Sequence, residues 1–410
     1  MARPVMSKKN SKKDLPAIEG GSPVRKTLLP YGHQTLGPDE EKAVLEVLRS
    51  DYITQGPKVT EFEAQIAKLV GKKHVVAVSN GTAALHCAAF AAALGQGDEA
   101  ITSPITFLAS ANCIAYMGAT PKFADIRLDT YNIDPVEVQG KISSRTKALI
   151  PVDFAGQPAD YEELSELAVD KGIMIIEDGA HSLGATYKGK PVGCQADLLT
   201  LSFHPVKHIT TGEGGAIATN DEELYWRLQT FRNHGMVRDK ERLKDKGAGA
   251  WFYEMQNLGY NYRLTDLQCA LGLAQLKRLP EFIRKRREIA KAYTKAIEGI
   301  KGLIPMVELP DRKTVFHIYL IRFEKALFKV DRKRIFEALR AENIGVNVHY
   351  IPVHLQPYYQ QRFGYRPGDF PKAEEYYETV LTLPVFPSMS RSDIEDVIEA
   401  VQKVFEYYRK

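Results

Sequence analysis

The sequence predicts an α/β fold in which a mostly parallel central sheet is covered by helices and is followed by a smaller α/β domain. The first observation is that short apolar runs, such as residues 75–79 and 198–203, alternate with amphipathic or alanine-rich segments. Strands that are apolar on both faces are typical of parallel sheets packed between helices. The second observation is a change of pattern near residue 300, where an alternating strand, a helix and another strand follow two long helices.

These patterns divide the chain into three parts. We expect a large domain at residues 26–298 and a small C-terminal domain at residues 299–410. Residues 1–25 are basic and polar and contain no apolar segment long enough for a secretory signal, so we expect them to form a disordered tail.

The composition is that of an ordinary globular protein, with 410 residues, 44% hydrophobic and 26% charged. The net charge of +4 gives no case for a nucleic-acid partner, and the chain has no apolar run of about 18 residues that would predict a membrane span. The cysteines are widely spaced and form no CxxC pattern, which favours free thiols in a reducing, cytoplasmic setting and no metal site. They are Cys87, Cys113, Cys194 and Cys269.

The helices can be predicted from their ends and their composition. Residues 36–49 carry Pro38 near the start and acidic residues in the first turn, where the helix dipole favours them. Residues 59–70 end at Gly71, a common helix terminator, and residues 82–94 are rich in alanine. Further helices are expected at residues 106–117, 161–171, 221–233, 264–279, 280–297, 331–342, 372–381 and 391–408.

Proline and apolar runs define the remaining elements. We expect Pro280 to separate two helices, because a proline inside a helix removes a backbone donor. The stretch 238–246 mixes both signs of charge and is expected to be a solvated loop, and a Pro- and Tyr-rich loop should run to Pro371. Strands are expected at residues 75–79, 148–154, 173–178, 198–203, 216–219, 315–323 and 346–350.

One loop carries the most informative residue of the chain. The buried strand 198–203 is stopped by Pro205, which cannot donate a ladder hydrogen bond, and Lys207 follows in a tight turn. The loop 210–215, Thr-Thr-Gly-Glu-Gly-Gly, exposes its backbone after it. A lone loop lysine is usually a solvated cation, but an anion cradle and a buried carboxylate precede this one, in the order that pyridoxal phosphate requires.

The phosphate of that cofactor needs backbone donors and positive potential. A helix N-terminus after a glycine supplies both, and Gly81-Thr82-Ala83 fits this need. The alternative is a strand–helix turn without a ligand. Ser202 is a further candidate for a phosphate contact.

The pyridine ring of the cofactor makes three further demands. Its nitrogen must stay protonated, and Asp178, at the end of an apolar strand, can remain ionised beside it; the alternative role is a capping carboxylate. His181 is placed to touch the ring oxygen or to cap a turn. The ring also needs an apolar face, for which Phe107 is a candidate, although it could equally be a core aromatic.

The aldehyde of the cofactor needs an amine. Lys207 would form the Schiff base and, once displaced by substrate, move a proton between Cα and C4′. Its amine must be neutral to attack, so its pKa must be depressed by burial or by neighbouring charges.

Five stretches carry a family resemblance that covers roughly residues 28–403. They are SNGTAALH (79–86), PITFLASAN (104–112), EDGAHSLGA (177–185), LSFHPVKHITTGEGG (201–215) and GYNYRLTDLQCALG (259–272). Together they resemble the DegT/DnrJ-type family of pyridoxal-phosphate-dependent nucleotide-sugar aminotransferases. The run around Lys207 is highly specific, whereas the Gly-Thr turn alone is weak.

The resemblance implies a fold type I aminotransferase that acts as a homodimer with both active sites at the interface. By motif position, Lys207 is the Schiff-base lysine, Asp178 the partner of the ring nitrogen and His181 the residue beside the ring. The implied phosphate contacts are Gly81, Thr82, Ala83, Ser202 and, from the other subunit, Asn261. Relatives that replace the lysine with His are dehydratases, and Lys207 argues against that activity.

The motif around Lys207 looks most like the motif of enzymes that aminate C4 of UDP-linked 4-keto-6-deoxy-N-acetylhexosamines. The usual amino donor of the family is L-glutamate. The most similar group makes UDP-4-amino-4,6-dideoxy-N-acetyl-altrosamine. The alternatives are amination at C3, a GDP- or dTDP-linked keto sugar, or a cofactor-binding regulator without turnover. Candidate contacts to the sugar or nucleotide are Glu213, Arg263, His349 and His354.

Overall fold

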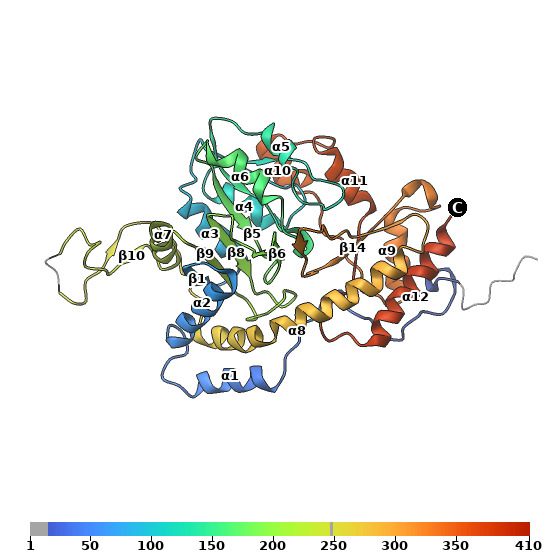
Figure 1. Cartoon of the computed structure of the whole chain (residues 1–410), viewed down its shortest axis with the longest axis horizontal. Coiled ribbons are helices and arrows are strands. Elements are labelled where there is room, and N and C mark those ends of the chain that lie inside the picture. Colours follow the sequence, from blue (N-terminus) through green and yellow to red (C-terminus); the bar gives the residue numbers. More distant parts are fainter. Residues whose placement is uncertain (1–14, 247–248) are drawn as a thin grey trace, which may run out of the picture.

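The computed structural model describes residues 15–246 and 249–410, and Figure 1 shows a central sheet with helices packed around it. The seven-stranded sheet has the order β1-β9-β8-β5-β4-β2-β3. Only β9 within it runs antiparallel to its neighbours, so the prediction of a mostly parallel sheet is confirmed. The strands are β1 His74–Val78, β2 Glu99–Thr102, β3 Thr120–Phe123, β4 Thr146–Ile150, β5 Met174–Asp178, β8 Leu198–Ser202 and β9 Gly215–Thr219.

Helices cover both faces of the sheet, and alternate residues of each strand pack against them. In β1, Val76 and Val78 pack with helices α3 (Gly81–Ala91), α4 (Leu108–Tyr116) and α7 (Glu222–Arg232). The intervening Val75 and Ala77 face α2 (Pro57–Val70) and α8 (Asp266–Ile297) on the other side. Side chains of a strand point alternately to opposite faces, so each strand contributes to two cores.

Helix α8 (Asp266–Ile297) corrects the prediction of two helices, because it continues through Pro280 as one helix of 32 residues. A proline removes one backbone donor, but Leu279 and Phe282 on either side of it are buried. The first half of α8 packs on α1 (Pro38–Leu48) and α2, and the second half packs on α12 (Arg391–Tyr408). Tertiary packing therefore outweighs the local cost of the proline. The helix ends next to the predicted domain boundary at residues 298/299, which stays a prediction.

The C-terminal region packs around an antiparallel sheet of order β12-β14-β15, in a core that it shares with Phe123, Phe154 and Ala155 of the preceding region. Its strands are β12 Leu303–Pro305, β14 Tyr319–Phe323 and β15 Leu381–Leu383, and its helices are α9 Arg332–Ala341, α10 Pro357–Phe363, α11 Pro371–Thr379 and α12. Three predictions differ from this. The strand expected at 315–323 begins only at Tyr319, α10 interrupts the expected loop before residue 371, and Leu381 belongs to β15 rather than to a helix.

The strand expected at residues 346–350 does not form. A single bridge between Asn347 and Thr382 is its only pairing within the described residues. Residues 347–350 instead line a cavity, described below. An apolar alternating pattern is compatible with either placement, which is why the sequence was misleading here.

Residues 15–25, predicted to belong to a disordered tail, are ordered against the C-terminal region. The backbone N–H groups of Ala17 and Val24 donate to the two carboxylate oxygens of buried Glu342 at 2.7 and 2.8 Å. Lys403 pairs with the same carboxylate at 2.9 Å. The rest of the predicted tail, residues 1–14, lies outside the described residues.

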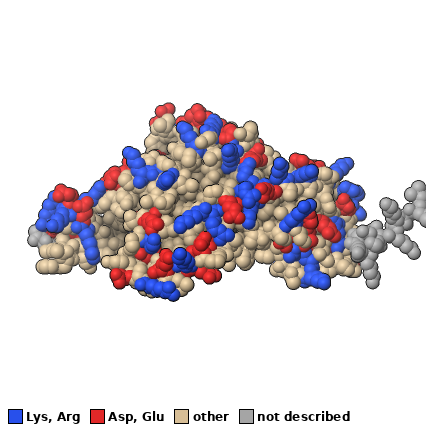
Figure 2. Space-filling model, turned by 60° about the horizontal axis from the view of Figure 1, so that its bottom comes forward, with Lys and Arg blue, Asp and Glu red and all other residues tan. Residues whose placement is uncertain are grey.

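Short elements and the surface complete the fold. The pair β10 (Met236–Val237) and β11 (Glu254–Met255) lies on an arm that projects beyond the sheet in Figure 1, and α5 (Pro135–Gln139) and α6 (Tyr161–Val169) cover another part of the sheet. The three-stranded sheet β13-β6-β7 joins Arg312–Lys313, Thr186–Tyr187 and Lys190–Pro191. Both signs of charge are interspersed on the face in Figure 2. All four cysteines are free, and no helix in the described part of the chain is long and apolar enough to cross a membrane.

Candidate active site

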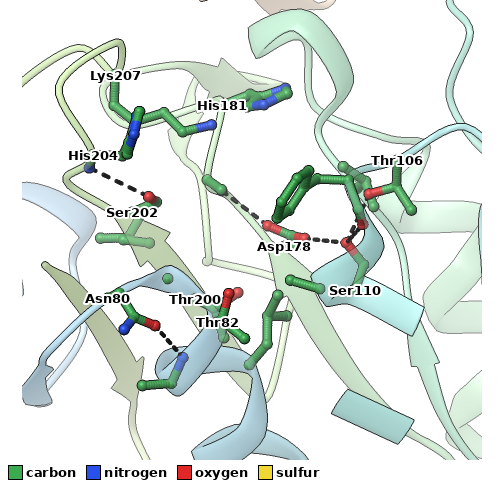
Figure 3. Close-up of a pocket in the computed structure, with 18 of the residues that line it drawn as sticks. Asn80, Thr82, Thr106, Ser110, Asp178, His181, Thr200, Ser202, His204 and Lys207 are labelled. Carbon is green, nitrogen blue, oxygen red and sulfur yellow. Dashed lines mark hydrogen bonds between the residues drawn. The ribbon is translucent and has the colours of Figure 1, made fainter. Parts of the chain in front are cut away.

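A cavity of about 1000 Å³ lies at the carboxyl ends of β5 and β8, where open α/β sheets commonly bind ligands. The N-terminal ends of α3 and α4 form one side, and residues 347–350 from the C-terminal region form another. Figure 3 shows its polar side chains converging on a common space. The predicted site residues that line it are Gly81, Thr82, Ala83, Phe107, Asp178, His181, Ser202, Lys207, Glu213 and His349.

The N-terminus of α3 forms the anion-binding end of the cavity. Asn80 caps the helix by accepting the Ala83 N–H on its side-chain oxygen at 2.8 Å, so the Ala83 amide is already in use. The amides of Gly81 and Thr82 have no partner among the described residues, and both residues line the cavity. A Cβ on Gly81 would lie 2.9 Å from the Cβ of Ser202, so only glycine lets the helix approach β8 this closely.

Asp178 is a buried carboxylate at the end of β5. It accepts hydrogen bonds from the Ser110 hydroxyl at 2.6 Å and from the Ala180 N–H at 3.1 Å, and no cation within the described residues forms a salt bridge with it. Burial raises the pKa of Asp178, while the bond from Ser110 and the charge of Lys207 act in the opposite direction. The carboxylate therefore lacks a cationic partner, which a protonated ring nitrogen would supply.

Lys207 lines the cavity from the turn that follows β8. Its backbone N–H donates to the carbonyl of His204 at 2.9 Å, which fixes the turn. Burial of the amine lowers its pKa to about 8, against the opposing attraction of Asp178. A substantial fraction of the amine is therefore neutral slightly above neutral pH, as a nucleophilic lysine requires.

Aromatic side chains shape the space between these groups. Phe107 is 57% exposed and lines the cavity, so it is a wall residue rather than a core aromatic. Its ring centroid is 6.1 Å from that of Tyr350. The imidazole of His181 is buried, and its Nε2 lies 3.4 Å from the Tyr350 hydroxyl. Burial first, and then the charge of Lys207, holds the pKa of His181 well below its usual range.

Three predicted residues do not line this cavity. Asn261 is exposed on the loop before α8, and the Arg263 guanidinium donates to the side-chain oxygen of Asn233 at 2.6 Å. His354 is fully buried and pairs with Glu374 at 3.0 Å. The geometry of the single chain thus separates all three from the lysine and the carboxylate.

The structure also adds residues that the sequence reasoning did not select. Ser110 bonds Asp178, Asn80 caps α3, and His317 places its Nε2 3.4 Å from the Lys207 amine. The i,i+4 spacing of Thr106 and Ser110 on a predicted helix was a signal for the first, because such residues share a face. Nothing in the local sequence connects His317 with a lysine 110 positions earlier.

These residues fit pyridoxal phosphate. A buried carboxylate and two helix N-terminal amides, none of them paired with a cation or an acceptor among the described residues, meet a lysine with a depressed pKa at one cavity. Each matches one part of the cofactor: the ring nitrogen, the phosphate and the aldehyde. The fold and this site together define a pyridoxal-phosphate-dependent enzyme of the fold type I aminotransferase class.

The comparisons identify the family within that class. Residues 34–402 match the DegT/DnrJ/EryC1/StrS aminotransferase family, and the chain belongs to it. The spore coat polysaccharide biosynthesis protein SpsC of Bacillus subtilis (strain 168) is 44% identical over 381 residues, covering 93% of this chain and 98% of that protein.

Solved structures agree with this assignment. Helicobacter pylori PseC, an aminotransferase involved in the biosynthesis of pseudoaminic acid, is 34% identical with a TM-score of 0.86, covering 93% of this chain and 100% of that one. The putative sugar aminotransferase Spr1654 of Streptococcus pneumoniae, in its PMP-form, is 32% identical with a TM-score of 0.87, covering 92% and 99%. The predicted fold class, cofactor and enzyme class are thereby confirmed, and the chain is a pyridoxal-phosphate-dependent sugar aminotransferase.

Proposed function

We propose that this enzyme transfers the amino group of L-glutamate to C4 of a UDP-linked 4-keto-6-deoxy-N-acetylhexosamine. The observation that carries the proposal is that Lys207 and Asp178 face one cavity beside the free N-terminus of α3. The 34% identity with PseC supports a nucleotide-linked keto sugar as the amino acceptor. The motif around Lys207 supports C4 as the carbon that receives the amino group.

The residues divide the chemistry between them. When bound, pyridoxal phosphate supplies an electrophilic carbonyl carbon and a ring that accepts electrons. Lys207 holds it covalently through its neutral amine, and Asp178 keeps the proton on the ring nitrogen. Once released, Lys207 takes the proton from the amine-bearing carbon of glutamate and holds it at Nζ. In the second half-reaction, Lys207 delivers a proton to C4 of the sugar.

Charge in the cavity supports a site shared between two subunits. Lys207 carries the only ammonium or guanidinium group among the described lining residues, whereas glutamate and a nucleotide diphosphate bring several negative charges. Further cations must therefore reach the substrates from outside this lining. In a homodimer, Asn261 and Arg263 of one protomer would contribute to the site of the other.

Exposed apolar residues support the same homodimer. On the arm that carries β10 and β11, Trp251 is 83% exposed, Leu258 is 76% exposed and Met255 is 65% exposed. Apolar side chains gathered on one projecting element mark an interaction site. We propose that a second copy of the chain covers them.

Among the substrate candidates, Glu213 and His349 line the cavity, so they keep a proposed role in sugar binding. The Nδ1 of His349 lies 2.8 Å from the Thr382 hydroxyl, and burial lowers the pKa of His349 to about 3, so its ring is a neutral hydrogen-bonding group. We propose no substrate contact for His354, because Glu374 and the core already enclose it.

The test is to incubate the purified protein with L-glutamate and a panel of keto sugar nucleotides that varies the nucleotide and the keto carbon. The proposal expects 2-oxoglutarate and a UDP-4-amino sugar, identified by mass and NMR, and the Lys207→Ala variant serves as the inactive control. Turnover only with a 3-keto sugar, or only with GDP- or dTDP-linked sugars, would replace the substrate assignment. A folded, cofactor-loaded protein without turnover on any keto sugar nucleotide would favour a regulator.

A further inference from the structure

His317 is a buried imidazole that the roles proposed so far do not use. Its Nε2 lies 3.4 Å from the Nζ of Lys207, and the residue is buried. Its other ring nitrogen, Nδ1, has no partner among the described residues. The contact with Lys207 is therefore the one hydrogen bond of this ring among the residues that the structure describes.

The backbone around His317 is held from several sides. Its N–H donates to the carbonyl of Ala155 at 3.0 Å, and its own carbonyl accepts from Nη1 of buried Arg286 at 2.9 Å. The same Nη1 also donates to the carbonyl of Phe316 at 3.3 Å. Phe316 has a φ of 47°, in the left-handed region that non-glycine residues rarely adopt. Backbone strain of this kind persists only where the surroundings fix it, and it is concentrated at functional positions.

The backbone of Gly156 also packs closely against the backbone of His317. A Cβ on Gly156 would lie 3.1 Å from the His317 backbone nitrogen and 2.8 Å from the His181 carbonyl oxygen. Gly156 itself has a φ of 94°, which favours glycine. The segment before β14 is thus fixed tightly on the large domain, and the ring of His317 reaches Lys207 from there.

The charges around Lys207 decide whether Lys207 or His317 carries the proton between them. Burial, and then the charge of Lys207, holds the pKa of His317 well below its usual range, so its ring is neutral and offers a lone pair. The ammonium form of Lys207 needs such an acceptor. The ionisable groups that interact with Lys207 are Asp178, Arg286, His181, His204, His208, His317 and His349.

We propose that His317 is a positioning residue that accepts a hydrogen bond from the ammonium of Lys207 and holds the released lysine towards the reacting carbon. This inference rests on the proposed role of Lys207. It assigns His317 no direct contact with substrate. It predicts that His317 stabilises the protonated amine and thereby keeps the lysine able to carry a proton near neutral pH.

The experiment measures the pKa of Lys207 directly in the full-length chain without cofactor. Trace acetic anhydride labels neutral amines at a series of pH values, and mass spectrometry quantifies acetylation of the peptide that contains Lys207. His317→Phe keeps a buried ring but removes the acceptor, and His317→Gln keeps a polar group near Nε2. The matched control is His208→Phe, which changes a second buried imidazole 5.4 Å from the His317 ring.

We expect the wild-type and His208→Phe chains to show half-maximal labelling of Lys207 near pH 8. His317→Phe should lower this midpoint by about one pH unit, which is the tenfold change expected from losing one hydrogen bond to a charged group. His317→Gln should bring the midpoint most of the way back to the wild-type value. With substrates, kcat should fall about tenfold in His317→Phe, and KM should change little. The basic limb of the plot of kcat against pH should move to lower pH, as the labelling midpoint does.

An unchanged or raised midpoint in His317→Phe would overturn the inference, as would an equal shift in His208→Phe. Near-UV circular dichroism checks the fold, and His317→Leu replaces the Phe variant if that variant does not fold. The role of Lys207 is read separately, from the position of the borohydride-trapped cofactor. A cofactor on another lysine would refute the proposed function, whatever the labelling midpoint of Lys207.

Discussion

Replacing Asp178 with Asn should change the stability of the protein and its affinity for the cofactor in opposite directions. The side chain keeps its shape, and its amide oxygen can still accept the Ala180 N–H. The amide nitrogen can donate to Ser110, whose hydroxyl already has Thr106 as a second neighbour at 2.7 Å. The fold should therefore survive while one buried negative charge is lost.

Without cofactor, this charge is a cost at neutral pH. Burial raises the pKa of Asp178, so its ionised form is disfavoured in the folded chain; the cost is complete above the folded pKa and declines as the pH falls from there to the unfolded pKa of about 3.9. We expect Asp178→Asn to stabilise the cofactor-free protein by about 1–2 kcal/mol at pH 7, the size of an imperfectly compensated buried polar group. The gain should vanish in acid, where both chains carry a neutral side chain.

With cofactor, the sign reverses, because the variant lacks the partner of the protonated ring nitrogen. Losing one member of a buried charged pair costs about 2–5 kcal/mol, so the affinity for pyridoxal phosphate should fall about 30-fold or more. Proton transfer at the substrate carbon should slow by orders of magnitude. Thermal unfolding with and without cofactor, a spectroscopic binding titration and the amino-transfer rate measure the three effects.

Ser110→Ala is the matched control, since it removes a hydrogen bond to the carboxylate but leaves its charge. It should weaken cofactor binding much less than Asp178→Asn. The reasoning would be refuted if Asp178→Asn destabilised the cofactor-free protein, or if it kept near-normal cofactor affinity and transamination.

Three further predictions test other parts of the site. The rate of cofactor loading should rise with pH and level off above about 8, because the Lys207 amine reacts only when neutral; a rate independent of pH between 6 and 9 would contradict the lowered pKa, and stopped-flow absorbance measures it. Gly81→Val should weaken pyridoxal phosphate binding while affecting pyridoxal much less, because the new Cβ meets Ser202 at 2.9 Å beside the free amides; equal loss for both ligands in binding titrations would argue against a phosphate site. Mixing Lys207→Ala with an impaired Asn261 variant should restore up to about a quarter of the wild-type sites by subunit exchange, since about half of the dimers are mixed and each has one intact site; mixed dimers without any gain in activity would show that Asn261 serves its own subunit.

Much of the fold could be predicted because strands and helices in this chain differ clearly in pattern. Strands β5 and β8 are short apolar runs, as buried strands are. Helix α12 begins at a capping box formed by Ser390 and Asp393. Pro280 was misleading because its cost is local, whereas the burial of Leu279 and Phe282 on either side of it is set by tertiary packing that is not visible in the sequence. Residues 346–350 were misleading because a pattern that suits a strand also suits a cavity wall.

The site was predictable where chemistry lies in a contiguous stretch. Asp178 ends a strand, and Lys207 and the turn at Gly81 each follow one; strand ends of one sheet come together in space. His317 reaches the lysine only because the C-terminal region folds back onto Ala155, a long-range contact without a local signal. Asn261 lies outside the single-chain cavity, so only a second copy of the chain can give it the predicted role.

The central claim is that Lys207 holds the cofactor covalently. Reducing the yellow, cofactor-loaded protein with borohydride, followed by proteolysis and mass spectrometry, locates the attachment point. The account predicts a single modified peptide that carries the pyridoxyl group on Lys207, and no such peptide from Lys207→Ala, although that variant should still bind the cofactor noncovalently. A pyridoxyl group on any other lysine of the wild-type chain would contradict the account.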